Sequence, residues 1–237
     1  MKTIARLTLS SLLRGWRGIL LALLPVATLL LSVAARSLVG GDTDGAVNGL
    51  LANLVMGTTL PLTLLIIGTG SISTEIDDGS IVYLLTKPVP RELIAVTKIG
   101  VAVGVSVLFG AVPVFLSALI LTGSVEAVTM SFLLASLIAC VVYCTLFVLL
   151  GVISRQAVMV GLLYILLWES LIAGLVPEVR VLSVRYWATS LVSRIAPDTI
   201  PADVNLVVAA VLAVLATVGG VYYAGRRLRS LTLAGES

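Results

Sequence analysis

The sequence contains no histidine, and only 11% of its 237 residues are charged. Histidine is the commonest general base and metal ligand in proteins, so its absence argues against a hydrolase or a redox enzyme. The only two cysteines, Cys140 and Cys144, lie four residues apart inside one apolar run. A zinc site needs about four ligands, and nothing else in the sequence supplies them. We therefore interpret the cysteines as small packing residues, and we predict no metal site and no catalytic residue.

The chain is instead rich in apolar residues, which make up 59% of it, and its mean hydropathy is +1.17. Soluble domains are nearer half apolar and a quarter charged, because their surface needs polar cover. The composition therefore predicts a membrane protein. The net charge of +3 comes from basic residues spread over loop positions, without the basic patch and interleaved aromatics of a nucleic-acid site. We expect membrane lipid as a partner and no nucleic acid.

Long apolar runs predict about six transmembrane helices, because roughly 20 apolar residues cross a bilayer. The fold class is therefore all-α, with one transmembrane domain over residues 1–237. The first run is longer than the apolar core of a signal peptide and further runs follow it, so we interpret it as an uncleaved helix. The predicted spans lie roughly at residues 18–35, 46–73, 93–121, 127–154, 157–176 and 204–224.

Two stretches outside these spans have the pattern of amphipathic helices. At the N-terminus polar residues recur every four positions, which indicates an interfacial helix or simply the start of the first span. Between spans five and six, apolar residues mark one face of a helix over residues 184–195, which we expect to lie on the outer membrane surface. Its apolar face holds Val184, Trp187, Ala188, Leu191, Val192 and Ile195, and Arg185, Ser190, Ser193 and Arg194 lie opposite.

The distribution of lysine and arginine predicts the orientation. With the N-terminus inside, cytoplasmic segments hold eleven of these residues, and external segments hold four. Such an excess of positive charge is typical of cytoplasmic loops, so both termini are expected in the cytoplasm. The eleven are Lys2, Arg6, Arg14, Arg17, Lys87, Arg91, Lys98, Arg155, Arg226, Arg227 and Arg229, and the four are Arg36, Arg180, Arg185 and Arg194.

The most polar segment runs from Thr74 to Lys98, between spans two and three. It is too polar to span a membrane, and its short apolar face and two prolines predict a short helix, a turn and then the third span. It contains Glu75, then Gly79-Ser80, then Leu84-Leu85-Thr86-Lys87-Pro88-Val89-Pro90-Arg91, then Lys98. This pattern resembles the first cytoplasmic loop of type-2 ATP-binding-cassette (ABC) exporter permeases, with Ser80 where threonine is more usual.

The rest of the chain agrees with this resemblance. The six-span plan is that of the family, so the likeness covers essentially the whole sequence. Trp168-Glu169 and the later Leu182-Ser183-Val184-Arg185-Tyr186 resemble one bacterial subgroup. The resemblance implies a bacterial inner-membrane permease that pairs with a second copy of itself or with a related permease. It also implies a separate nucleotide-binding subunit that holds ATP and Mg²⁺, since this chain lacks the phosphate-binding motif G-x-x-x-x-G-K-[ST].

In that family the loop between spans two and three forms a coupling helix that docks on the ATPase subunit. The resemblance assigns this role to Glu75, Asp77, Asp78, Gly79, Ser80, Lys87, Pro88, Arg91 and Lys98. Acidic groups suit the start of a short helix, and proline stiffens the turn that follows. The alternative is that these polar residues only solvate a loop.

Glu169 is the one acidic residue inside a predicted span. A carboxylate at that depth costs a few kcal/mol unless it is protonated or paired. It either lines a substrate path or gate, or pairs with Arg180, Arg185 or Tyr186 and so fixes the external helix to the bundle.

Two other classes of function compete with the exporter permease. An ion-gradient-driven secondary transporter or channel-like protein usually has inverted repeats and several polar residues at mid-membrane. This sequence has one acid there and no visible repeat, which ranks that class second. A membrane enzyme or a scaffold is the third, and the missing histidine argues against the enzyme.

Overall fold

The computed structural model describes residues 16–39, 45, 47–71, 91–154, 156–197, 199–200 and 203–233. Every regular element within those ranges is a helix. Six helical stretches are long and apolar enough to cross a membrane, and they fall on the six predicted segments. These are Gly18–Leu38, Gly49–Gly70, Val96–Thr122, Ala127–Ile153, Ala157–Leu175 and Leu206–Arg227. The predicted class, an all-α polytopic membrane protein, is thus confirmed, while the expected N-terminal and coupling helices lie outside the described residues.

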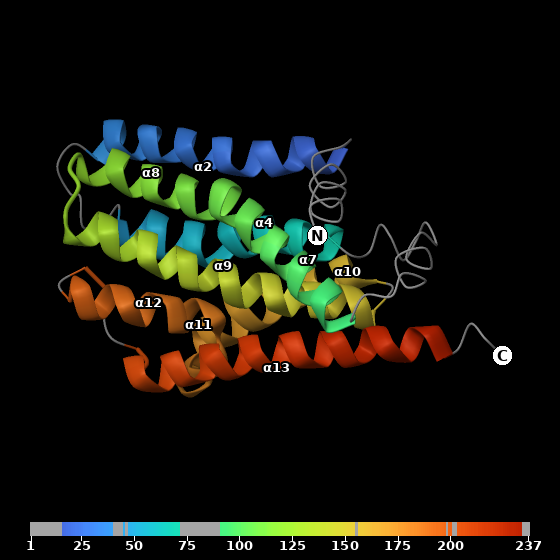
Figure 1. Ribbon diagram of the computed structural model, residues 1–237. Helices are drawn as coiled ribbons and strands as arrows, with labels where there is room; N and C mark the ends of the chain where they lie inside the picture. The colour runs from blue at the N-terminus through green and yellow to red at the C-terminus, as the bar shows by residue number, and fades with distance from the viewer. Residues whose placement is uncertain are drawn as a thin grey trace.

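The spans are built from the following elements (Figure 1). The first two are α2 (Trp16–Val39) and the pair η1 (Val47–Thr59) and α4 (Leu60–Gly70). The third joins α7 (Arg91–Ser106), η2 (Val107–Ala111) and α8 (Val112–Thr122), and the fourth is α9 (Ala127–Ile153). The fifth joins α10 (Ala157–Leu163), η3 (Tyr164–Ile172) and α11 (Ala173–Leu175). Then come η4 (Pro177–Leu182), α12 (Val184–Ile195) and the sixth span, α13 (Leu206–Leu233).

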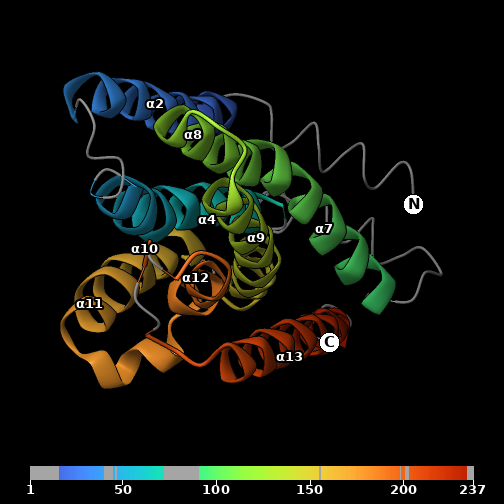
Figure 2. The ribbon, with the colours of Figure 1, turned by 90° about the vertical axis from the view of Figure 1, so that its left-hand side faces the viewer.

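Helix α9 lies at the centre of the bundle. It packs against α4, α7, α8, α12 and α13, whereas α2 packs on α8 at one side (Figure 2). The axes of the long helices are roughly aligned, with α8 and α9 running in opposite directions (Figure 1), so the bundle has two ends. We call them the Gly123 end, where α8 meets α9, and the Ser71 end, where α4 finishes and α7 begins (left and right in Figure 1).

Two prolines inside the spans follow stretches of wider, π-helical winding. Pro61 is the second residue of α4 and comes after η1, and Pro113 is the second residue of α8 and comes after η2. A proline inside a helix lacks an N–H donor, and its ring clashes with the carbonyl of the preceding turn. Wider winding upstream relieves that clash. Threonine hydroxyls supply extra bonds there, since Thr63 Oγ1 donates to the Thr59 carbonyl at 2.8 Å.

Close contacts between helices occur where one of them carries glycine. A Cβ added at Gly68 on α4 would lie 2.6 Å from the Phe147 Cβ on α9. Such small residues let backbones approach, which is how membrane helices gain van der Waals contact. A Cβ added at Gly100 or Gly104 of α7 would meet no other heavy atom within 4 Å among the residues that the structure describes, so these two glycines make no such close contact there.

A glycine turn joins α8 to α9 at the Gly123 end. Gly123 has φ of +79° and caps α8 in the left-handed conformation that glycine adopts most easily. Arg36, from the last turn of α2, donates from Nη1 to the carbonyls of Ile120 and Leu121 at 2.5 and 3.1 Å. The last carbonyls of α8 are thereby paired, and α2 is tied to α8 at this end.

Helix α12 has the predicted bounds but not the predicted surface position. It runs beside α9 and α13 inside the bundle instead of lying flat across its end (Figures 1 and 2). Residues of the predicted polar face, Ser190 and Ser193, are buried together with Trp187 and Val192 of the apolar face. Arg194 of that polar face is exposed.

The hydroxyl groups of α12 explain why its polar face can be buried. Ser190 Oγ donates to the Trp187 carbonyl at 2.7 Å, and Ser193 Oγ donates to the Ser190 carbonyl at 2.9 Å. Thr189 Oγ1 donates to the Arg185 carbonyl at 3.1 Å. Serine and threonine satisfied by their own helix backbone need no water, so the hydroxyl side can pack as closely as the apolar side.

The contact at Gly68 gives a first test. Gly68→Ala places a methyl group against Phe147 and its backbone, so the free energy of unfolding should fall by about 1–3 kcal/mol. Gly104→Ala is the matched control, because the space beside it is open and alanine favours the helix. We expect a lower Tm for the first variant only, measured by thermal unfolding in detergent. Equal Tm values for the two variants would contradict the close contact.

Candidate functional site

Most of the predicted coupling residues lie in a part of the chain that the structure does not describe. These are Glu75, Asp77, Asp78, Gly79, Ser80, Lys87 and Pro88. Arg91 is the first residue of α7. The structure therefore places only the two ends of this segment, Ser71 at the end of α4 and Arg91 at the start of α7, together with Lys98 in the second turn of α7.

Lys98 ties the two flanking helices together. Its side chain is 1% exposed, and its Nζ donates to the carbonyl oxygen of Ser71 at 2.9 Å. Ser71 is the C-cap of α4, and its own Oγ donates to the Gly68 carbonyl at 2.8 Å. The C-terminus of a helix carries a partial negative charge from its unpaired carbonyls, which favours a cation there. The bond thus connects α4 and α7 directly across the undescribed residues 72–90.

Glu169 is completely buried, with 0% exposure, and it accepts three hydrogen bonds. Its Oε1 accepts from the Tyr164 hydroxyl at 2.9 Å and from the backbone N–H of Val184 at 3.0 Å. Its Oε2 accepts from the Ser183 hydroxyl. Two of these donors belong to the start of α12, so a side chain of the fifth span holds the first turn of the inserted helix.

The carboxyl group occupies the place of an N-cap for α12. Ser183 is the N-cap residue, yet its side chain makes no capping bond within its own helix. The first N–H groups of a helix lack partners and form a partly positive end, and Glu169 satisfies the first of them, that of Val184. Of its two predicted roles, this geometry describes the attachment of the helix to the bundle, although the partners are not Arg180, Arg185 or Tyr186.

Aromatic rings connect this acid to the central helix. Tyr143 and Phe147 of α9 stack with ring centroids 5.6 Å apart, and Phe147 meets Tyr164 edge-on at 6.4 Å. Tyr164 in turn bonds Glu169. The spacing of five residues between Tyr164 and Glu169 does not predict this pairing, because such residues lie on different faces of an α-helix. The π-helical winding of η3 brings them together.

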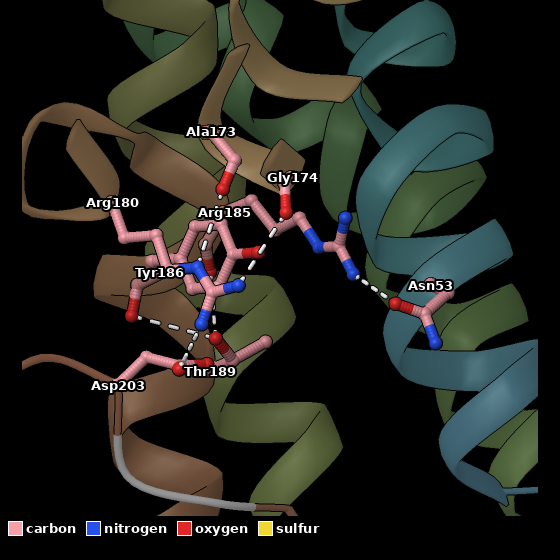
Figure 3. Close-up of polar contacts among 8 residues, drawn as sticks. All are labelled: Asn53, Ala173, Gly174, Arg180, Arg185, Tyr186, Thr189 and Asp203. Carbon is pink, nitrogen blue, oxygen red and sulfur yellow. Dashed lines mark hydrogen bonds and ion pairs between the residues drawn. The ribbon is translucent and has the colours of Figure 1, made fainter. Parts of the chain in front are cut away.

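A second polar cluster surrounds Arg180, which lies in η4 (Figure 3). Its Nη1 forms an ion pair with Asp203 at 2.5 Å. Its Nε donates to the Ala173 carbonyl at 3.3 Å and its Nη2 to the Gly174 carbonyl at 3.4 Å. One arginine therefore joins the end of the fifth span to the residues that lead into α13.

Arg185 extends this cluster to the second span. Its Nη2 donates to Asn53 Oδ1 of η1 at 2.5 Å (Figure 3). The Tyr186 ring lies beside both guanidinium groups, whose central carbons are 5.2 Å (Arg180) and 5.4 Å (Arg185) from its centroid. These contacts fall in the range of cation–π attraction. The sequence places both arginines outside the predicted spans, but it does not identify Asn53 or Asp203 as their partners.

An apolar groove of about 480 Å³ runs between α9 and α13. Its lining includes Ile138, Val141, Val214 and Val218, and Glu169 does not line it. A groove of this kind suits an acyl chain or another lipophilic group. The buried acid and the groove are thus separate features of the protein.

Comparison with known proteins identifies a family. The profile of the family described as "ABC-2 family transporter protein" matches residues 15–176, which is well over half of the chain. The match includes the first five spans and residues 72–90. No curated protein matches the sequence.

The bonds to Glu169 give a second test. In Glu169→Gln the amide oxygen can still accept from Tyr164 and Val184, so we expect the variant to fold with a Tm close to that of the wild type. Glu169→Leu leaves three polar groups unpaired, each at a cost of about 1–3 kcal/mol, so it should be strongly destabilised.

Transport separates the two predicted roles of Glu169. If the carboxylate acts on substrate, the folded Glu169→Gln variant loses export, and if it only holds α12, export is retained. A Glu169→Leu variant as stable as the wild type would contradict the attachment of α12 by this residue.

Proposed function

Because the chain belongs to the ABC-2 transporter family, we propose that it is the membrane-spanning permease subunit of an ATP-driven exporter. In this proposal a separate nucleotide-binding subunit binds ATP and Mg²⁺ and hydrolyses the nucleotide. The permease acts with a second copy of itself or a related permease in the bacterial inner membrane, with both termini in the cytoplasm. The family match over residues 15–176 is the observation that carries the proposal.

The bond between Lys98 and Ser71 supports a mechanical role for residues 72–90. A segment pushed by a partner moves a membrane helix only if the two are rigidly joined. The Lys98 Nζ and the Ser71 carbonyl are 2.9 Å apart in a buried setting, where such a bond is stronger than in water. A force on the segment would therefore reach α4 and α7 together rather than bend one of them.

The polar residues of the segment supply the docking contacts in this proposal. Glu75, Asp77 and Asp78 offer negative charge to basic groups of the ATPase subunit. Lys87 and Arg91 offer positive charge on both sides of Pro88, whose ring restricts the backbone. Gly79 and Ser80 lie between the two groups. Surface charge of this kind contributes more to the choice of partner than to affinity.

The path by which motion reaches the rest of the bundle follows from the packing. Helix α4 contacts the central helix α9, and α9 contacts α12 and α13. Since Gly68 of α4 lies directly against Phe147 of α9, a shift of α4 moves α9 as well. In this proposal the substrate moves along a surface of the permease, and the packed helices α4, α9, α12 and α13 form one side of that surface.

Charge reversal in the segment tests the docking role. We expect the tagged protein to co-purify with a nucleotide-binding subunit in mild detergent, and Glu75→Lys with Asp77→Lys to release that subunit and its ATPase activity. Glu178→Lys is the matched control, because Glu178 is an exposed acid in η4, outside the proposed docking segment. It should leave the complex intact.

Two results would contradict the proposal. The first is a permease that purifies without any ATPase and whose transport follows an ion gradient, as in a secondary transporter. The second is release of the ATPase by the control variant as readily as by the double variant.

Lys98 gives a separate test of coupling. Lys98→Met keeps the length of the side chain but removes the bond to Ser71, leaving a buried carbonyl unpaired at a cost of about 1–3 kcal/mol. We expect the variant to bind the ATPase subunit normally while substrate-dependent ATPase activity and export fall together. Arg226→Met is the control, since Arg226 is exposed on α13. Full export by Lys98→Met would show that the bond transmits no motion.

A further inference from the structure

The polar cluster at Arg180 and Arg185 encloses a cavity of about 200 Å³. Its polar lining consists of Asn53, Arg180, Arg185, Tyr186, Thr189 and Asp203 (Figure 3). A water molecule occupies about 30 Å³ in the liquid, so the cavity has room for roughly six of them. That is enough space for one tetrahedral oxyanion such as phosphate.

The cavity lies where two spans end. Asn53 is in the first turns of the candidate span Gly49–Gly70, and Arg180 bonds Ala173 and Gly174 at the end of Ala157–Leu175. The ends of transmembrane helices coincide with the level of lipid headgroups. A ligand presented at that level reaches the cavity without crossing the hydrocarbon core.

The charges around the cavity do not cancel. Arg180 is neutralised by its ion pair with Asp203. Within the described part of the chain, the guanidinium of Arg185 contacts neutral groups, namely the amide of Asn53, the ring of Tyr186 and the backbone at Gly57. The cavity wall therefore carries one net positive charge, at a side chain that is only partly exposed. A cation held away from bulk water favours an anionic partner.

The donors of Arg185 are also incompletely used. A guanidinium group has five N–H donors, and its hydrogen bond to another side chain, Asn53, employs one nitrogen. The guanidinium also packs against Gly57, where an added Cβ would lie 2.8 Å from Nη1 and 3.0 Å from Cζ, and its Cζ lies 5.4 Å from the centroid of the Tyr186 ring. These contacts limit rotation of the guanidinium plane. A fixed plane with open donors matches the bidentate geometry in which arginine binds phosphate oxygens.

We propose that this cavity binds a phosphate-type oxyanion, with Arg185 as its principal ligand and Thr189 and Asn53 as further polar contacts. The anion is either the headgroup phosphate of a lipid or a free phosphate. Arg180 and Asp203 form the opposite wall and hold the end of the fifth span in place. This site is independent of residues 72–90 and of the coupling to an ATPase.

The purified full-length protein in dodecyl maltoside and phosphate-free buffer at constant ionic strength provides the test. It is titrated with inorganic phosphate, with dioctanoyl phosphatidylglycerol, and with dioctanoylglycerol as the phosphate-free control, and Tm is followed. We expect phosphatidylglycerol to raise Tm and dioctanoylglycerol to leave it unchanged. A rise with inorganic phosphate as well indicates a site for free phosphate, and its absence indicates a headgroup site.

Three variants locate the effect. Arg185→Gln should weaken the binding of phosphatidylglycerol by about tenfold or more, as expected for loss of a charge-assisted contact. Arg194→Gln, an exposed arginine of the same helix, should bind as the wild type does. Asp203→Asn removes the only negative charge of the described wall and should bind more tightly, even if its own Tm falls.

The proposal is overturned if neither phosphate compound raises Tm more than dioctanoylglycerol does. It is also overturned if Arg185→Gln and Arg194→Gln bind phosphatidylglycerol equally well. Equal or weaker binding by Asp203→Asn would mean that the positive charge of the cavity wall does not hold the anion, and would overturn it too.

Discussion

Buried polar groups in this bundle have to find their partners inside the protein, because lipid offers no hydrogen-bond donors or acceptors. Lys98 and Glu169, which are both buried, meet this demand in opposite ways. Lys98 donates a hydrogen bond to the carbonyl end of a helix, and Glu169 accepts a hydrogen bond from the N–H end of another. The basic side chain thus lies at the partly negative terminus of a helix, and the acidic side chain at the partly positive terminus of another. The placement of α4 against α7, and of α12 against the fifth span, follows from these two bonds.

The same demand explains how a short, polar helix can be inserted among long apolar ones. Helix α12 is too short to cross a bilayer, and its first turn lies within the protein. Glu169 satisfies that turn, and serine and threonine hydroxyls bond within the helix itself. Near the start of the helix, Arg185 reaches the second span through Asn53. The inserted helix is therefore attached at several points to neighbouring elements, which gives the bundle a packed interior on the side of the Gly123 end.

The sequence predicted some of these features and not others, for physical reasons. Apolar runs of sufficient length predicted all six spans, since composition alone decides whether a helix can stay in lipid. The resemblance singled out Lys98, but its acceptor is a backbone carbonyl, which no residue type reveals. The position of α12 was missed because periodicity shows which residues share a face and not whether a hydroxyl is already satisfied by its own backbone. The close contact at Gly68 could not be predicted, because the helix that packs against a glycine decides where backbones meet and the sequence does not show which helix that is.

The bond from Lys98 to a main-chain oxygen also has a consequence for evolution. A carbonyl is present whatever side chain position 71 carries, so the partner of Lys98 can change identity without losing the contact. The backbone N–H of Val184, which donates to Glu169, is likewise present with almost any side chain at position 184. Among related sequences, the residue at position 98 should then remain basic, while the residue type at position 71 can vary. Methods that look for correlated substitutions would find no trace of this contact.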